Sequence, residues 1–348
     1  MIKIVINGRF LTQSYTGVQN FSLSYTSKLY EIYNNKLIVI VPKLSKINKE
    51  LDFLFPVTKI GINRGHLWEQ LDLPFYLKTL NSPLLINLGN SGPIYYSNKL
   101  ITIHDLSIYK DKSWHNAVYR LFYKFLTPKI ISNCHKIITV SNSSKKELIN
   151  KFKNLENIII VVSNTVKKEN FNEDSIRSRE PYFLFVGTLN KRKNLSNLVK
   201  AMNSIKNKNI SLKIVGVNKE EFYNEFGDIE NIQVLGNIYG CDLNKLYKNS
   251  NGLLFPSHYE GFGIPIIEAM LHKCPVLCSD IDVFNEICKD ASIYFNQNDY
   301  IDIKKKILSI YKNNKLIESL INKGSMRVSK YYIDNNINFF KKQIDNLI

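Results

Sequence analysis

The fold is decided by Leu253–Met270, which reads LLFPSHYEGFGIPIIEAM. An apolar strand ends at Phe255, a short loop follows, and the glycine turn Gly261–Gly263 leads into a helix. Pro265 marks the start of that helix, because proline is favoured in the first helical turn. Glycines let main-chain N–H groups approach a ligand closely, and a helix N-terminus carries positive partial charge. The loop therefore suits an anion such as a diphosphate.

Two acids frame this loop, Glu260 before the glycines and Glu268 in the helix, with seven residues between them. Carboxylates often bind vicinal hydroxyls of sugars, so the pair could bind two sugars on either side of a phosphate bridge. The alternative is one solvated loop acid and one surface helix acid. The glycines between the acids favour the binding interpretation.

On both sides of this segment, short runs of β-branched residues alternate with segments in which apolar residues recur at the helical period. This pattern is typical of parallel sheets covered by helices. Expected strands of a first series are Ile2–Ile6, Lys36–Val41, Leu84–Asn87, Leu100–Ile103, Lys136–Val140 and Asn157–Val162. Those of a second series are Tyr182–Val186, Ser211–Val215, Asn231–Leu235, Gly252–Phe255, Pro275–Cys278 and Ser292–Tyr294. Two complete series predict two doubly wound α/β domains.

The length of 348 residues also favours two domains. The polar, aperiodic segment Lys167–Pro181 is the expected linker. We therefore predict domains at 1–166 and 167–328, and an amphipathic helix at about 329–348 that packs back onto the first domain.

Charge is the outlier of the composition: 47 Lys and Arg against 30 Asp and Glu give a net charge of +17. Such an excess favours an anionic partner: nucleic acid, a phosphorylated small molecule or a membrane surface. The basic residues are dispersed and match no nucleic-acid-binding motif, so we expect no nucleic acid. No apolar run reaches the roughly 18 residues of a membrane span, and no signal peptide is evident, which predicts a cytoplasmic protein.

A second chemical cluster lies at Phe183–Asn194, where a buried strand ends in a glycine turn at Gly187. Lys191, Arg192 and Lys193 follow directly before a helix. Cations at the carboxyl end of a strand, beside a helix N-terminus, are well placed to neutralise phosphates.

Together the two clusters resemble the retaining glycosyltransferases of family 4, which have the GT-B fold of two Rossmann-like domains facing across a cleft. The resemblance covers about residues 1–330. Its motifs are EGFGIPIIEAM at Glu260–Met270, FVGTLNKRKNL at Phe185–Leu195, VLGNI at Val234–Ile238, NGRFLTQSYTGVQNF at Asn7–Phe21, RGHLWEQLDLP at Arg64–Pro74, TIHDLS at Thr102–Ser107 and ITVSNSSKKEL at Ile138–Leu148.

The resemblance implies a nucleotide-sugar donor bound mainly to the second domain. Glu268 would hold the ribose, Glu260 would hold the donor sugar, and Arg192 and Lys193 would hold the diphosphate. The nucleobase would lie near Gly216–Val217 and Asn237–Ile238. The further donor-binding residues that the resemblance implies are Gly17, Gly187, Gly261, Phe262 and Gly263. His104 would face the transferred sugar, and it joins Glu260, Arg192 and Lys193 as an expected catalytic residue.

The expected reaction is metal-independent transfer of a hexosyl unit, with retention of configuration, to a glycan or undecaprenyl-linked acceptor. Two cations and a helix N-terminus would stabilise the leaving diphosphate, and no Asp-x-Asp motif stands in a metal-binding context. The expected pathway is bacterial surface polysaccharide synthesis: O-antigen of lipopolysaccharide, capsule or exopolysaccharide. UDP, GDP and dTDP donors remain open, and the alternative is a nucleotide-sugar epimerase of GT-B shape.

The basic, aromatic stretch Trp114–His135 has two interpretations. It could be a helix on an anionic membrane surface that meets a lipid-linked acceptor, since each basic residue near such a surface contributes about 1 kcal/mol. The alternative is a crossover helix that covers the first sheet. The first interpretation predicts peripheral association with the inner face of the plasma membrane.

Overall fold

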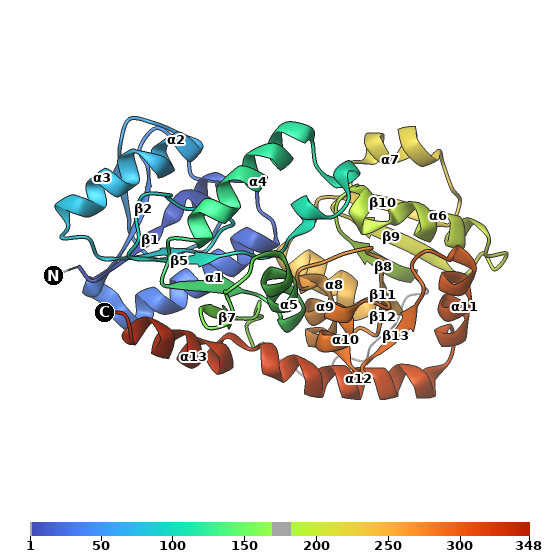
Figure 1. The fold of residues 1–348 in the computed structure, drawn as a ribbon. Helices are drawn as coiled ribbons and strands as arrows, with labels where there is room; N and C mark the ends of the chain where they lie inside the picture. Colours follow the sequence, from blue (N-terminus) through green and yellow to red (C-terminus); the bar gives the residue numbers. More distant parts are fainter. Residues whose placement is uncertain (1, 169–181) are drawn as a thin grey trace. The chain divides into compact units, whose positions relative to one another are not determined.

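A computed structural model describes residues 2–168 and 182–348 (Figure 1). The chain divides into two compact units, one of Met1–Thr165 with Ile333–Ile348 and one of Val166–Tyr332. The boundaries expected from the sequence were 166/167 and 328/329. The expected linker at Lys167–Pro181 lies, from residue 169 onward, outside the described residues.

The first unit is built on a seven-stranded sheet of order β3-β2-β1-β4-β5-β6-β7, in which every pair is parallel. The order reverses between β1 and β4. The strands are β1 Ile4–Asn7, β2 Leu37–Pro42, β3 Val57–Ile60, β4 Leu84–Asn87, β5 Lys99–Thr102, β6 Lys136–Thr139 and β7 Ile159–Val161.

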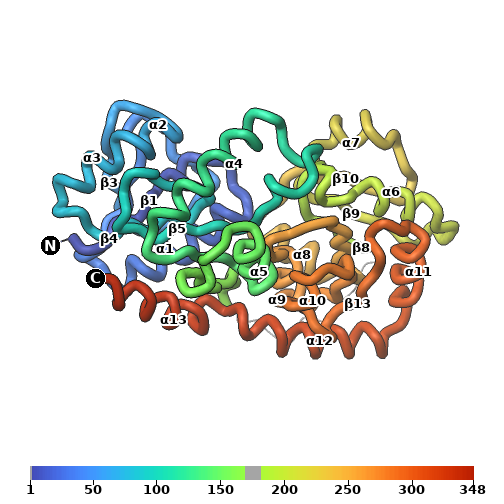
Figure 2. The backbone as a smooth tube through the Cα atoms, in the orientation of Figure 1, coloured from blue at the N-terminus to red at the C-terminus, as the bar shows by residue number. Residues whose placement is uncertain are grey.

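Helices cover the first sheet on both faces, as a doubly wound fold requires (Figure 2). They are α1 Gly17–Tyr33, α2 Gly65–Gln70, α3 Asp72–Thr79, α4 Ala117–Ile131, α5 Asn142–Lys151 and α13 Ile333–Asp345, with short 3₁₀ turns at Gly8–Thr12, Asn34–Lys36, Ser107–Tyr109 and Lys112–Trp114.

The C-terminal helix α13 packs on α1. The ring of Phe340 meets that of Tyr25 edge-on, with centroids 5.5 Å apart, and Tyr33 donates a hydrogen bond to Asp345 at 2.7 Å. The last segment of the chain is thereby part of the first unit.

The second unit is built on a six-stranded parallel sheet of order β10-β9-β8-β11-β12-β13. Its strands are β8 Tyr182–Val186, β9 Ser211–Val215, β10 Ile232–Gly236, β11 Gly252–Phe255, β12 Val276–Ser279 and β13 Ser292–Phe295. Its helices are α6 Leu195–Asn203, α7 Lys219–Phe226, α8 Gly240–Asn249, α9 Ile264–Leu271, α10 Asp282–Cys288, α11 Tyr300–Ile310 and α12 Asn314–Val328, with 3₁₀ turns at Lys191–Lys193 and Ser329–Tyr331.

All twelve expected strands are present, with ends shifted by at most two residues. Strand β3 was not predicted, because it lies at the sheet edge and its partly exposed residues place two polar side chains between two apolar ones. The expected helix over Trp114–His135 is shorter, since α4 begins at Ala117 and ends at Ile131. Strands of a parallel sheet are covered on both faces, so their sequences are largely apolar. In β1 and β11, accordingly, every residue is buried.

Candidate active site

In the second unit the strand order reverses between β8 and β11, which are neighbours in the sheet. Ligands of open α/β sheets bind at the carboxyl ends of the strands at such a switch point. The chain leaves β8 into Gly187–Lys193 and leaves β11 into Pro256–Gly263. The fold therefore brings the two clusters of the sequence to one point.

Glu260 makes two ion pairs there. Its Oε2 lies 2.6 Å from Arg192 Nη1, and its Oε1 lies 2.6 Å from Lys193 Nζ. Lys193 Nζ also lies 4.8 Å from the centre of the Phe255 ring. Three of the four expected catalytic side chains thus form one cluster of net charge +1.

This cluster keeps Glu260 ionised. Burial would raise the pKa of its carboxyl group, but the charges of Arg192 and Lys193 outweigh burial and lower the pKa to about 2. Ser257, which is fully buried, donates a further hydrogen bond to Glu260 Oε1 at 2.9 Å. The carboxylate in turn positions both cations.

Asn194 joins the two loops. Its backbone adopts the left-handed conformation, with φ of 56°, which asparagine tolerates better than most residues. Its side-chain amide donates to Pro256 O at 3.0 Å and to Gln297 O at 2.7 Å. Asn194 therefore holds the end of the basic turn against the loop that follows β11.

The glycine loop ends at the N-terminus of α9. No side chain caps this helix, and its N-cap residue, Gly263, has a φ of 130° that other residues rarely adopt. Main-chain N–H groups of a helix start form an anion site when no side chain occupies them. Phe262 is 5% exposed and packs edge-on against Tyr331, so any contribution of this residue to donor binding comes from its main chain.

Glu268 lies in α9 and accepts a hydrogen bond of 3.0 Å from the hydroxyl of Tyr247. Burial raises the pKa of Glu268, and the bond from Tyr247 opposes that rise. The two acids that frame the loop are thus in opposite electrostatic environments. Glu260 is held ionised by two cations, whereas Glu268 is paired with a neutral phenol.

The expected nucleobase residues line two cavities. One, of about 610 Å³, lies at the ends of β8, β9 and β10; its lining residues are Thr188, Leu189, Gly216, Val217, Asn218, Lys219, Glu220, Glu221, Gly236 and Asn237. Gly216 has a φ of 88°, and a Cβ there would lie 2.7 Å from Gly187 O. The two glycines therefore let the turns after β8 and β9 come together.

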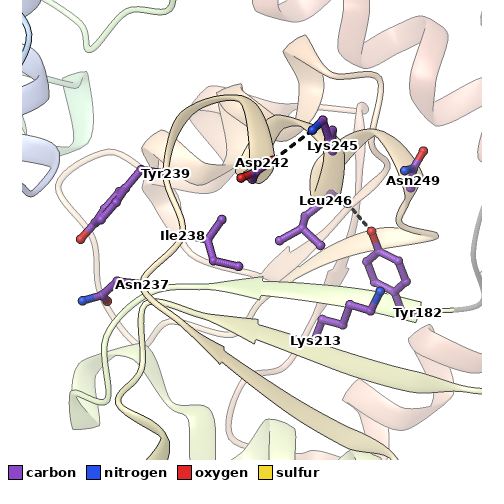
Figure 3. A pocket seen from close by; sticks show the side chains of 9 residues that line it. All are labelled: Tyr182, Lys213, Asn237, Ile238, Tyr239, Asp242, Lys245, Leu246 and Asn249. Atoms are coloured by element: carbon purple, nitrogen blue, oxygen red, sulfur yellow. Dashed lines mark hydrogen bonds and ion pairs between the residues drawn. The ribbon is translucent and has the colours of Figure 1, made fainter. Parts of the chain in front are cut away.

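The other cavity, of about 530 Å³, lies between the sheet and α8 (Figure 3). Asn237, Ile238 and Tyr239 line it from the loop after β10, Tyr182 and Lys213 from the strands, and Asp242, Lys245, Leu246 and Asn249 from α8. Asn237 belongs to both cavities. It therefore marks the loop where the expected base site and the α8 cavity meet.

The remaining expected residues belong to the first unit. Gly17 is the exposed first residue of α1, after the N-cap Thr16. His104 is buried, and its Nε2 lies 2.8 Å from Leu88 O. Since a carbonyl only accepts, Nε2 carries the hydrogen and Nδ1 is the acceptor. Burial lowers the pKa of His104, which favours this neutral form.

In residues 2–168 and 182–348, no group of three or more His, Cys, Asp or Glu side chains is arranged to hold a metal ion. Over the same residues, no helix has both the length and the apolar character needed to cross a bilayer.

Residues 166–327 match the family model of "Glycosyl transferases group 1". The chain is 26% identical over 351 residues to the O-antigen chain mannosyltransferase RfbU of Salmonella typhimurium, covering 95% of this chain and 96% of that protein. It is 25% identical over 268 residues to the O-antigen chain mannosyltransferase B of Escherichia coli, covering 70% of each. The chain is a glycosyltransferase.

The fold of the glycosyltransferase matches solved structures over its whole length. The sucrose-phosphate synthase of Thermosynechococcus elongatus aligns with a TM-score of 0.75 at 17% identity, covering 99% of this chain and 98% of that chain. The two Rossmann-like units are those of the GT-B fold. The family model and the mannosyltransferase relatives do not favour the epimerase alternative. Membership of family 4 and retention of configuration stay predictions.

Sequence reasoning missed several residues that position the site of the glycosyltransferase. Ser257 acts through Glu260, which lies only three residues further along the chain. Asn194 acts through the basic turn and Tyr247 through Glu268, and the partners of these two residues are distant in sequence. Only Asn194 carried a local signal, as an asparagine directly before a helix. A buried cluster around Arg9 and Glu69 in the first unit was missed as well.

Proposed function

We propose that the glycosyltransferase moves a hexosyl unit, with retention of configuration, from a nucleoside-diphosphate sugar to a glycan or undecaprenyl-linked acceptor. The observation that carries the proposal is the cluster of Arg192, Lys193 and Glu260 at the switch point of the second sheet. Together with the uncapped start of α9, it is suited to the negative charge of a leaving diphosphate.

The chemistry follows from the charges. Cleavage of the bond between the sugar and the phosphate leaves an additional negative charge on the diphosphate, and two preorganised cations lower the energy of that state. The departing phosphate oxygen takes the proton of the acceptor hydroxyl on the same face of the sugar as the new glycosidic bond forms. We therefore propose transfer that needs neither a metal ion nor a separate general base.

Mannose is the first donor sugar to test, and a surface polysaccharide is the first product class. Both choices rest on the relatives, two of which are named O-antigen chain mannosyltransferases. The cavity at the expected base site is lined by the glycines Gly216 and Gly236 and by polar residues such as Glu221, and we leave UDP, GDP and dTDP open as donors.

Peripheral membrane association is part of the proposal. Helix α4 is a crossover helix, because it connects β5 to β6 and buries Leu126 and Ile130. Its opposite side exposes a second apolar stripe beside basic residues: Val118, Leu121, Phe122 and Phe125, with Lys124 and Lys129. An amphipathic basic surface of this kind suits anionic lipid. A cytoplasmic enzyme at the inner face of the plasma membrane would use it to meet a lipid-linked acceptor.

The test is a thermal-shift panel of UDP-, GDP-, dTDP- and CMP-sugars with and without EDTA, followed by a donor-hydrolysis assay. A donor at about 100 times its Kd stabilises the protein by roughly 2.7 kcal/mol. We expect one base class to raise the Tm equally in both conditions, and Lys193→Ala to abolish the shift. A shift that requires a divalent ion, or that persists in Lys193→Ala, contradicts the proposed donor site.

A further inference from the structure

A second polar cluster lies at the switch point of the first sheet, between β1 and β4. Glu69 of α2 is fully buried, and its Oε1 accepts hydrogen bonds from Asn7 Nδ2 at 2.7 Å and Ser91 Oγ at 3.0 Å. Arg9 donates to Ser91 Oγ at 2.6 Å, and its Nε lies 3.4 Å from Glu69 Oε1. Asn7 ends β1, and Ser91 follows β4, so the cluster occupies the ligand edge of this sheet.

Stability does not account for this cluster. A buried ion pair rarely stabilises a fold more than apolar residues of the same volume. Arg9 is 9% exposed, and its buried Nε makes no hydrogen bond to any described residue. Burial would raise the pKa of Glu69, but the charge of Arg9 and the contact with His66 lower it, so the carboxylate stays ionised. Such perturbed, costly groups gather at functional sites.

The exposed edge of the cluster is aromatic. His66 Nδ1 lies 3.2 Å from Glu69 Oε2, and the side chain of His66 is 30% exposed. Its ring lies against that of Phe122, with centroids 4.6 Å apart, and Phe122 is 38% exposed. Tyr123 OH lies 3.4 Å from His66 Nε2. In neutral His66, Nδ1 donates to the ionised carboxylate and Nε2 accepts.

The neighbours of Glu69 in the sequence hold this edge in place. Trp68 is fully buried and donates from Nε1 to Ile60 O at 3.1 Å. Gln70 donates to Gly92 O and accepts from Ile94 N, both at 2.9 Å, so it ties α2 to the loop after β4. The three consecutive residues of α2 thus make a rigid support.

The charge of the cluster selects its ligand. An anion that approaches Arg9 also meets Glu69, so the two charges cancel, unlike the net positive cluster of the second unit. What remains is hydrogen-bonding capacity beside aromatic faces. Aromatic rings with polar edges suit a ligand that is apolar on its faces and rich in hydroxyls at its rim.

We propose that His66 and Phe122, supported by the Arg9–Glu69 pair, form the binding subsite for a neutral sugar ring of the acceptor. The sugar packs on the ring of Phe122, and a hydroxyl donates to His66 Nε2 in exchange with Tyr123. The identification of this sugar as the acceptor rests on the proposed function. The binding of a neutral sugar at the subsite does not depend on the donor.

The experiment is saturation-transfer-difference NMR on the full chain with four probes: the methyl glycosides of mannose, glucose, galactose and N-acetylglucosamine. His66→Ala and Phe122→Ala change partly exposed residues and leave the buried pair intact. The matched control is Phe125→Ala, an exposed phenylalanine one turn further along α4 that makes no ring contact with His66 in the described structure. Lys193→Ala is the control for binding in the second unit.

We expect at least one glycoside to receive saturation, and its signal to fall at least fivefold in His66→Ala and Phe122→Ala but not in Phe125→Ala or Lys193→Ala. Signals from no glycoside, or signals that survive both changes, overturn the proposal. The proposal is also overturned if pyrophosphate shows ³¹P line broadening that is lost in His66→Ala, because that result would assign the subsite to an anion. A thermal shift by a donor separates the two proposals. His66→Ala should keep this shift, and its absence in the wild type refutes the donor site alone.

Discussion

Lys193 Nζ and Glu260 Oε1 lie 2.6 Å apart although 67 positions separate the two residues in the chain. The contact joins the loops at the carboxyl ends of β8 and β11, and Arg192 completes it from the same turn as Lys193. The carboxylate compensates one of two positive charges and holds both cations in place. Charge and geometry at this site therefore depend on one pair of loops.

Replacing Lys193 by alanine should lower kcat by about 10²-fold, because a preorganised charge at the leaving group is lost. Lys191→Ala is the matched control, since Lys191 is an exposed cation of the same turn and should change kcat by no more than about twofold. Initial rates of donor hydrolysis measure both. Equal losses in the two variants would show that only the overall basic charge of the turn matters.

Glu260→Gln should destabilise the protein in a pH-dependent way. The pKa of Glu260 falls from 4.5 to about 2 on folding, so its ionisation contributes about 3 kcal/mol above pH 4.5 that is lost as the pH falls toward 2. Urea unfolding should show the difference between wild type and variant shrinking by roughly 1 kcal/mol between pH 6 and pH 3.5.

Glu268→Gln is the control for that titration. Because folding raises the pKa of Glu268, its ionisation opposes folding, and the wild type should lose stability relative to this variant as the pH rises from 3.5 to 6. The same sign of pH dependence in both variants would contradict the assigned environments.

Gly216→Ala should destabilise the second unit by about 2–4 kcal/mol, from backbone strain at φ of 88° together with the clash of Cβ with Gly187 O. Gly236→Ala isolates the strain, because Gly236 has a φ of 81° and no atom within 4 Å of a Cβ. That variant should lose only about 1–2 kcal/mol. Chemical denaturation of both measures the difference, and similar losses would exclude the close contact of the two turns.

His104 should titrate below pH 6.5, with its hydrogen on Nε2. Burial disfavours the imidazolium form, so the stability due to neutral His104 is present above pH 6.5 and is lost as the pH falls below that value. The ring ¹⁵N shifts report the tautomer, and the Cε1–H shift reports the pKa. A midpoint at or above 6.5 would contradict the effect of burial on this side chain. A hydrogen on Nδ1 would contradict the bond to Leu88 O.

The fold was largely predictable because parallel strands buried on both faces leave continuous apolar runs, such as those of β8 and β11. Strand β3 left no such run, since an edge strand buries less of its surface. Local rules also located the cations and acids of the second unit, because a residue that follows a strand lies at the ligand edge of the sheet.

Contacts between distant residues were not predictable in this way. Nothing around Tyr247 indicates that its hydroxyl meets Glu268, and nothing around Glu69 indicates Asn7, Ser91 and Arg9 as its partners. Each contact depends on the positions of two or more elements, and the residues in between carry no record of it.

The sequence by itself determined the two-sheet α/β organisation, the glycine loop at Gly261–Gly263 and the residue types available for binding, because these follow from local periodicity and backbone freedom. Only the tertiary structure decided that Glu260 pairs with both Arg192 and Lys193, that Phe262 is buried, and that a neutral polar cluster forms around Glu69. The physical reason is that charge compensation and burial depend on distances in space, which are set only when the strands assemble into sheets.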